Sequence, residues 1–376
     1  MKKKLAILGA SYLQRPLIEK AKEIGIETHV FAWRDDCVIL DIADFFYPIS
    51  VIEREPILQK CKEIDIHGVT SIGSDIAMPT VNYIAEKMGL VGNTLEATIV
   101  TTDKLYMREA LTKAGIPCPY FELYLKPTFK DIKRFKFPVI IKPTDRSGSK
   151  GVTKVEKPKD VNVAIKRALA NSINGRAIVE EFIEGREFSV EMISYKGDHY
   201  YLATTDKVTT GAPYFVEIEH HQPADISYTV EKRIIQVVKK ALDVLHISNS
   251  ASHSEILITN DGSIRIIEIA GRMGGDFIGS DLVELSTGYN FLKGVIYLSL
   301  GVFTIPQKRI DKFSGVYFLS KEREYLKTII ETSCDSNIVK AEINNLNIRN
   351  LQSSDDRSGF IIYKSNKKIV FNNSIH

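Results

Sequence analysis

The sequence predicts an α/β protein in which a parallel-sheet domain comes first and mostly antiparallel α+β structure follows. Three observations carry this prediction. The chain has 376 residues, which is too long for one ordinary hydrophobic core and indicates two or three domains. Residues 1–97 alternate strand and helix patterns, as in a doubly wound parallel sheet. Later segments instead join apolar strands through short turns, which is typical of antiparallel pairing.

The overall composition is that of an ordinary soluble globular protein. Apolar residues make up 44% and charged residues 26%, and the formal net charge of +3 is too small to indicate a nucleic-acid or membrane partner. The apolar start is too short for a signal peptide, and no apolar run is long enough to span a bilayer. Four scattered cysteines (Cys37, Cys61, Cys118 and Cys334) predict a reducing, cytoplasmic location.

The first domain is expected to repeat a strand–helix unit. The periodicity predicts strands at 4–8, 27–33 and 68–73 and helices at 12–25 and 74–88. Glycines at 25 and 89 end the two helices. The turn Gly9–Ser11 lacks the G-x-G-x-x-G pattern, so we expect a plain strand-to-helix turn and no dinucleotide site.

The second domain is expected over residues 98–301. Thr102 or Asp103 caps a helix that Gly115 ends, and "FPVIIKP" is an apolar strand followed by the glycine-containing loop "TDRSGSKGV". "RAIVEEFIEGREFSVEMIS" predicts two strands joined by a turn at Glu184–Gly185. "SEILITNDGSIRIIEIAG" predicts a hairpin that turns at Asn260–Gly262. The more polar residues 302–376, with strands at 313–320 and 359–364, are expected to form a small third domain.

Two carboxylates stand on the two strands of that hairpin. Glu255 and Glu268 would repel each other if they shared a face, and a divalent cation such as magnesium would remove the repulsion. The alternative is that they point to opposite faces, and the hairpin alone favours neither. Lys142 ends an apolar strand, where an ammonium needs a partner, and the loop after it could wrap a phosphate. Alone, that loop is more often a plain hairpin connection.

The segment "VEEFIEGREFSVE" carries a third group of candidates. Glu180 and Glu181 precede Phe182 and Ile183, whose backbone could bond to the edge of an adenine, and Glu187 could accept from ribose hydroxyls. Without the other motifs, an exposed acidic turn is the better interpretation. Lys104 alone would likewise be a solvated helix residue.

The order of these motifs over residues 1–300 resembles the ATP-grasp superfamily. The resemblance implies a Rossmann-like parallel-sheet lead domain (1–97), a two-part α+β ATP-grasp domain (98–301) and a small C-terminal α+β domain (302–376). Such enzymes hold ATP between two subdomains and make an acylphosphate that an amine attacks. The implied roles are phosphate contacts for Lys104 and Lys142, a loop over the phosphates at Ser147, Gly148, Ser149 and Gly151, adenine and ribose contacts for Glu180, Phe182, Ile183 and Glu187, magnesium ligands at Glu255 and Glu268, and an anion clamp at Arg272.

One position departs from the common pattern of the superfamily. Ala270 replaces the asparagine of Glu-x-Asn, which normally contributes to a second metal. "EIAGRMGGD" instead resembles the branch of bacterial L-amino-acid ligases, which make dipeptides, as does "PYFVEIEHHQPA" with Glu217 and His220. In that branch His220 would orient the amine or take its proton. A surface histidine beside His221 is an equally good interpretation.

The sequence therefore predicts a cytoplasmic, ATP-dependent carboxylate–amine ligase that uses Mg²⁺, with Mn²⁺ as a substitute. Its expected partners are a small carboxylic acid and an amine, most simply two amino acids, and the resemblance also allows a homodimer. Two alternatives stay open: an enzyme of the carboxylase type that phosphorylates bicarbonate, and a nucleotide-binding protein without catalysis. The glycine-rich "AGRMGGD" favours an organic acid over bicarbonate.

Overall fold

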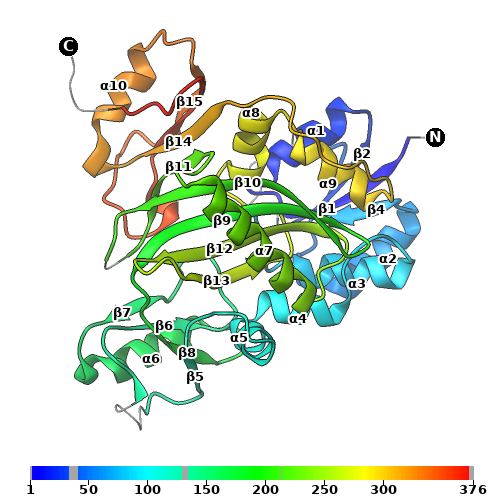
Figure 1. Ribbon diagram of the computed structural model, residues 1–376. Helices are drawn as coiled ribbons and strands as arrows, with labels where there is room; N and C mark the ends of the chain where they lie inside the picture. The colour runs from blue at the N-terminus through cyan, green and yellow to red at the C-terminus, as the bar shows by residue number, and fades with distance from the viewer. Residues whose placement is uncertain (1, 34–40, 129–133, 213, 372–376) are drawn as a thin grey trace.

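The protein contains three β-sheets, seen in a computed structural model that describes residues 2–33, 41–128, 134–212 and 214–371 (Figure 1). Cys37 lies outside the described residues, whereas Cys61, Cys118 and Cys334 are free thiols. Within those ranges no helix combines the length and apolar character needed to cross a membrane.

The lead domain is a parallel sheet, as the alternating pattern predicts. Its strands are β1 (Lys4–Leu8), β2 (Glu27–Phe31), β3 (Phe45–Tyr47) and β4 (Gly68–Thr70), in the order β3-β2-β1-β4. Helix α1 (Arg15–Glu23) connects β1 to β2, α2 (Arg54–Ile64) connects β3 to β4, and α3 (Met78–Met88) follows β4. Helix α3 ends at Gly89, whose φ of 64° suits glycine. Helices α4 (Leu95–Thr102) and α5 (Lys104–Lys113) follow, and the Asp103 side chain caps α5 by accepting from the Leu105 N–H.

A small antiparallel sheet forms one wall of the molecule and lies at the bottom of Figure 1. It contains β5 (Phe121–Tyr124), β6 (Val139–Pro143), β7 (Thr153–Val155) and β8 (Ala177–Glu181) in the order β5-β8-β6-β7. Helix α6 (Val161–Asn171) buries Val161, Ala164, Ile165 and Ala168 against this sheet. The spacing of these residues is that of an amphipathic helix.

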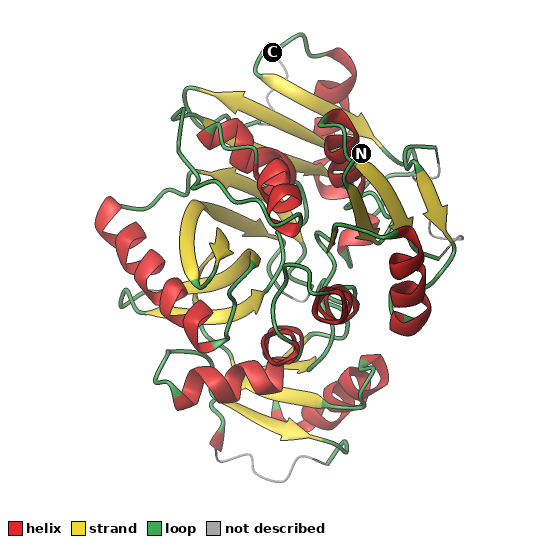
Figure 2. Cartoon of the chain, turned by 90° about the vertical axis from the view of Figure 1, so that its right-hand side faces the viewer, coloured by secondary structure: helices red, strands yellow, loops and turns green. Residues whose placement is uncertain are grey.

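A large antiparallel sheet of eight strands forms the centre of the molecule (Figure 2). Along the chain it comprises β9 (Gly185–Tyr195), β10 (Asp198–Thr209), β11 (Glu217–Gln222), β12 (Ser250–Thr259), β13 (Ile264–Ala270), β14 (Phe313–Leu319), β15 (Ile338–Ile343) and β16 (Gly359–Ser365). Helix α7 (Tyr228–Val244) buries its apolar face against one side of the sheet. A π-helical turn (Ile278–Leu282), α8 (Val283–Thr287) and α9 (Phe291–Ser299) follow β13.

The last 75 residues add strands to this same sheet. β14 pairs with β11, and β16 and β15 follow it outward, with α10 (Tyr325–Thr332) between β14 and β15. The C-terminal segment is therefore continuous with the sheet that carries the hairpin of Glu255 and Glu268. The divisions expected at residues 97 and 301 stay predictions.

The two strands expected around Glu184–Gly185 belong to different sheets. β8 pairs with β5 and β6 in the small sheet, whereas β9 pairs with β10 and β12 in the large one. The chain therefore passes between the sheets at residues 182–184. We call this connection the hinge.

Candidate active site

A cavity of about 620 Å³ lies between the small and the large sheet. Most of the residues that the sequence nominates line it: Lys104, Lys142, Ser147, Gly148, Ser149, Glu180, Phe182, Ile183, Glu187, Glu255, Glu268 and Arg272. They come from α5, β6, the glycine loop, the hinge and the β12–β13 hairpin. Two nominated residues within the described ranges, Gly151 and His220, are absent from the lining.

The two hairpin carboxylates lie directly opposite each other. Glu255 pairs with Glu268 across β12 and β13, so both side chains project from the same face of the sheet. Glu255 and Glu268 thus share one face of the sheet, and the alternative that they point to opposite faces is wrong. A lysine contacts each carboxylate: Lys207 Nζ lies 2.6 Å from Glu255, and Lys104 Nζ lies 2.8 Å from Glu268.

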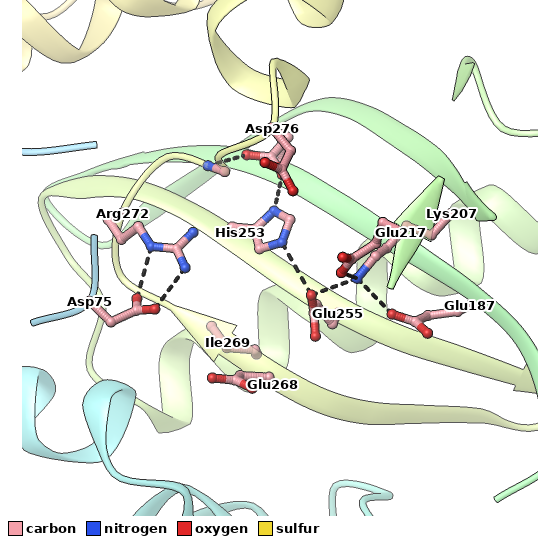
Figure 3. Close-up of polar contacts among 12 residues, drawn as sticks. Asp75, Glu187, Lys207, Glu217, His253, Glu255, Glu268, Ile269, Arg272 and Asp276 are labelled. Atoms are coloured by element: carbon pink, nitrogen blue, oxygen red, sulfur yellow. Dashed lines mark hydrogen bonds and ion pairs between the residues drawn. The ribbon is translucent and has the colours of Figure 1, made fainter. Parts of the chain in front are cut away.

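Lys207 is a site residue that the sequence analysis missed. It stands on β10, and its ammonium contacts Glu187 at 2.6 Å and Glu217 at 3.5 Å in addition to Glu255 (Figure 3). Burial lowers the pKa of Lys207, but the surrounding carboxylates outweigh it and raise that pKa well above its usual value. A charged residue in a buried strand was the available signal, and it is the same signal that marked Lys142.

Lys104 begins helix α5 and reaches across the cavity floor. Its ammonium donates to the Arg146 carbonyl at 2.6 Å as well as to Glu268. Burial alone would lower the pKa of Lys104, but the Glu268 carboxylate reverses the shift and raises it. Lys104 therefore carries a positive charge at the carboxylate pair of Glu255 and Glu268 and is buried, so the interpretation as a solvated helix residue is wrong.

Lys142 takes part in a buried network that also holds Glu180. Lys142 Nζ contacts Glu180 at 2.7 Å, and Arg108 of helix α5 contacts the other Glu180 oxygen at 2.8 Å. Arg108 also donates to the Ile267 carbonyl at 2.6 Å. Burial lowers the pKa of Lys142 despite its carboxylate partner. Arg108 thus links the small sheet to β13 beneath the cavity, a long-range role with no local sequence signal.

The glycine loop is the connection of the β6–β7 hairpin. Gly148 and Ser149 have positive φ angles of 64° and 56°, and both line the cavity with Ser147. Gly151 instead packs beside the loop, because a Cβ there would lie 2.9 Å from Pro143 and from Asn171. The loop is therefore both a hairpin connection and part of the cavity wall.

Arg272 is held by a carboxylate from the lead domain. Its Nε and Nη2 donate to the two oxygens of Asp75, each at 2.8 Å, in a bidentate pair (Figure 3). The backbone joins the same segments, since the Gly73 N–H donates to the Met273 carbonyl at 3.2 Å. Burial raises the pKa of Asp75, but Arg272 outweighs burial and lowers it. Asp75 follows the short strand β4 of the lead domain, 197 residues before Arg272, so this ion pair could not be predicted from the sequence.

His253 adds a second residue that sequence analysis missed. Its Nδ1 bonds to the buried carboxylate of Glu191, and its Nε2 lies 3.6 Å from Glu255. Burial lowers the pKa of His253, but Glu191 outweighs it and raises the pKa to about 9. Glu191 also accepts from the Gly274 N–H at 3.1 Å, and a Cβ on Gly274 would lie 2.7 Å from His253. The glycine therefore makes room for this pair of side chains.

His220 projects from the same face of the sheet as its cross-strand partner Lys207, but it is buried beside the cavity and does not line it. It is 1% exposed, packs edge-on against Phe318, and neither of its buried ring nitrogens has a hydrogen-bond partner. Burial lowers the pKa of His220 well below its usual value. The histidine is thus buried rather than on the surface, and it is not among the residues that line the cavity.

The carboxylate pair suits a cation whose other ligands come from a bound substrate rather than from the protein. Among the described residues no group of three or more His, Cys, Asp or Glu side chains is placed to hold a metal. Magnesium is commonly held by one or two carboxylates together with substrate phosphates, so Glu255 and Glu268 fit such a cation. In the structure, the ammonium groups of Lys104 and Lys207 compensate the negative charges of the two carboxylates.

The two sides of the carboxylate pair differ in origin. We call the residues Glu180, Phe182, Ile183 and Glu187 the hinge side, and Arg272, His253 and Asp75 the loop side. Arg272 and Asp75 lie on one side of Glu255, and Glu187 and Lys207 lie on the other (Figure 3). One elongated ligand could therefore contact the hinge, pass the carboxylate pair and end near Arg272.

Residues 135–281 match the family model of the ATP-grasp domain. The alanine–anticapsin ligase of Bacillus subtilis (strain 168) is 25% identical over 304 residues, which are 70% of this chain and 64% of that protein. The D-alanine–D-alanine ligase of Flavobacterium johnsoniae is 25% identical over 277 residues, 69% of this chain and 82% of that one. The chain thus spans 64% of the length of the alanine–anticapsin ligases it matches.

A similar fold is found in solved structures. The L-amino acid ligase from Bacillus licheniformis superposes with a TM-score of 0.81 at 21% identity, covering 97% of this chain and 94% of that one. The superposition extends over the lead domain and the C-terminal strands, so the whole arrangement of sheets has a counterpart.

Proposed function

Because the chain carries an ATP-grasp domain, we propose that it is an ATP-dependent carboxylate–amine ligase that forms an amide or peptide bond and releases ADP and phosphate. One observation carries this proposal. Glu255 and Glu268 face each other in a cavity that also receives Lys104, Lys142 and Arg272. That arrangement offers cations for phosphates, carboxylates for a metal and a guanidinium for an acid.

ATP fits the hinge side of the cavity. Phe182, Ile183 and Glu187 line the cavity. The backbone at Phe182 and Ile183 would bond to the adenine edge, and Glu187 would accept from the ribose hydroxyls. Lys104, Lys142 and the backbone of Ser147–Ser149 would surround the phosphates. Mg²⁺, held by Glu255 and Glu268, would neutralise charge on the phosphates during transfer.

The acid fits the loop side. Its carboxylate would take the place of Asp75 on the Arg272 guanidinium, or share the guanidinium with it. A carboxylate oxygen attacks the terminal phosphorus of ATP, ADP leaves, and an acylphosphate remains. The amine nitrogen then attacks the acyl carbon, the bond from that carbon to the phosphate oxygen breaks, and the departing phosphate takes the proton that the nitrogen gives up. Arg272 would balance the negative charge at both steps.

The substrate class follows from the relatives. Alanine–anticapsin ligase and D-alanine–D-alanine ligase are named for amino-acid substrates, so we propose that acid and amine are both amino acids.

Free thiols at Cys61, Cys118 and Cys334 agree with the proposed location in a reducing cytoplasm. The homodimer implied by the resemblance is a prediction that sedimentation velocity would test.

A matrix of carboxylic acids against amines, read by phosphate release with ATP and Mg²⁺, tests the proposal. Release that needs both an acid and an amine, with a new amide detected by mass spectrometry, supports the ligase. Release that needs bicarbonate instead of an organic acid would identify the carboxylase-type alternative. ATP binding without phosphate release across the whole matrix would leave the chain as a nucleotide-binding protein.

A further inference from the structure

The loop that carries Arg272 ends in an unusual backbone conformation. Asp276 and Phe277 are consecutive non-glycine residues with φ angles of 50° and 66°, in the left-handed region. Side chains with a Cβ rarely adopt this region, and two in succession persist only where surrounding contacts hold them. The strain lies four and five residues after Arg272, just beyond Gly274 and Gly275.

The side chains that hold these two residues come mainly from the C-terminal segment, with one contact from the lead domain, where the Tyr12 hydroxyl lies 3.5 Å from Asp276. Arg357 Nη1 pairs with Asp276 at 2.8 Å, and its side chain is 7% exposed. The Phe277 ring packs on Phe360 of β16 with centroids 4.3 Å apart and stacks on Phe318 of β14 at 6.3 Å. Burial raises the pKa of Asp276, but Arg357 outweighs it and keeps the pKa low.

Arg357 also reaches the residues beside the metal-binding pair. Its Nε donates to the Glu217 carbonyl at 3.1 Å, and its Nη2 contacts the Glu217 carboxylate at 3.2 Å. Glu217 faces the cavity and lies 3.5 Å from Lys207. The guanidinium stacks over Phe318, 3.9 Å from the ring centroid, which fixes its plane. One side chain thus ties the end of the loop to the cavity wall.

We propose that the C-terminal strands act as a lock on the loop 271–277 and that Arg357 is its positioning residue. The lock holds Asp276 and Phe277 in their strained conformation, and this places Arg272 and Gly274 where the acid binds. The inference rests on the proposed function for the identity of that ligand. It gives residues 302–376 a part in acid binding, although Arg357 itself does not touch the acid.

The chain supplies a matched control for this lock. Arg323 also comes from the C-terminal segment, is also nearly buried, and also reaches strand β11, where it contacts Glu219 at 2.5 Å and the Ile218 carbonyl at 2.9 Å. Its other side-chain partners are Tyr325 and Tyr317 rather than the loop. Arg323→Gln therefore removes a comparable anchor of the C-terminal strands and leaves the contacts of Asp276 and Phe277 in place.

The test compares Arg357→Gln and Arg323→Gln by two measurements. Amide hydrogen exchange of peptides covering 271–282, without any substrate, should speed up about ten-fold in Arg357→Gln and stay unchanged in Arg323→Gln. The KM for the acid should rise about ten-fold in Arg357→Gln, while ATP affinity stays within about two-fold of wild type. Equal exchange in the two variants would overturn the lock, whatever the activity.

A double variant separates positioning from direct contact. Asp276→Asn in the Arg357→Gln background removes the stranded buried carboxylate, and asparagine tolerates the left-handed region better than most residues. The KM for the acid should then recover in part. No recovery would mean that Arg357 grips the acid directly. If Arg357→Gln does not fold, Arg357→Lys serves, with a smaller increase in exchange expected. A wild-type protein without acid-dependent ADP release would refute the ligase, yet the exchange experiment would still test the lock.

Discussion

The hinge side and the loop side of the cavity take their side chains from very different distances along the chain. Glu180, Phe182, Ile183 and Glu187 lie within eight residues of one another, in the hinge and in the strands β8 and β9 that it joins. On the loop side, Asp75 and Arg272 are 197 residues apart, and His253 and Glu191 are 62 apart. The hinge side is thus built locally, whereas the loop side forms only when the lead domain, the large sheet and the C-terminal segment come together.

This difference indicates how the two sides could change independently. The described contacts join the two sides at Glu255, which Lys207 links to Glu187 and which lies 3.6 Å from His253. The carboxylate pair of Glu255 and Glu268 lies between them and faces both. We therefore expect substitutions on the hinge side to alter ATP affinity, and those on the loop side to alter the use of the acid. Substitutions at the pair should affect the whole reaction.

Glu268→Gln should produce the largest effect, because it acts at the pair between the two sides. The substitution keeps the shape of the side chain but removes the charge that we propose binds the metal, which is also the partner of Lys104 at 2.8 Å. Turnover should fall on the order of 10²–10³-fold, a loss comparable to that of a key electrostatic group in a transition state. ADP release at saturating Mg²⁺ measures it, with Glu19→Gln, an exposed carboxylate of α1, as the control. Near-normal, Mg²⁺-dependent turnover would remove Glu268 from the metal site.

Arg272→Lys sharpens the comparison on the loop side. Lysine keeps the charge but loses the planar fork that grips a carboxylate through two parallel bonds, here those to Asp75. The loss should be about 2–4 kcal/mol in the transition state, or roughly thirty- to several hundred-fold in kcat/KM for the acid. ATP affinity, measured by calorimetry, should change little. Wild-type turnover in this variant would show that Arg272 is not the anion clamp.

Lys142→Ala is the corresponding test on the hinge side. A lost charge-assisted hydrogen bond to phosphate is worth about 1.5–3 kcal/mol, which weakens ATP binding roughly ten- to a hundred-fold. Arg108 keeps Glu180 paired at 2.8 Å, so the variant should fold. The KM for the acid at saturating ATP should stay near that of wild type. A variant that changed acid use more than ATP affinity would break the division into two sides.

The same division explains which parts of the site the sequence could predict. Hairpin turn residues place Glu255 and Glu268 on neighbouring strands, so their proximity could be predicted. That they share a face could not, because a register shift between Glu255 and Ile256 brings them opposite each other. The hinge residues are neighbours in sequence and follow an apolar strand, so their joint position could also be predicted. Fold class was predictable for the related reason that strand–helix alternation in residues 1–97 and turn chemistry farther on are local patterns.

The remaining residues could not be predicted because their partners are distant in sequence. Asp75, Arg108, Glu191 and Lys207 are charged residues whose partners only the tertiary fold identifies. The C-terminal strands read as a separate unit because they are more polar, and nothing local shows that β14 pairs with β11. His220 shows a different limit: the family pattern that suggested a role near the amine carries no sign that the imidazole is buried, and that role stays a prediction.

His220→Leu should have the smallest effect on turnover and a measurable effect on stability. The structure buries this imidazole without a partner, facing Asp276, Lys207, Arg357 and His221, and burial holds its pKa well below the usual value. A histidine with a lowered pKa binds a proton more readily when unfolded, so its contribution to stability is lost as pH falls through 6.5. Leucine removes two unsatisfied buried nitrogens and should stabilise the fold by about 1–2 kcal/mol at neutral pH. The gain in the free energy of unfolding should grow between pH 7 and 5, as measured by urea unfolding.

Turnover of His220→Leu should stay within about three-fold of wild type, since the side chain lies outside the cavity lining. A large loss of turnover with intact ATP binding would instead make His220 a working part of the loop side, and the comparison between the two sides would need to include it.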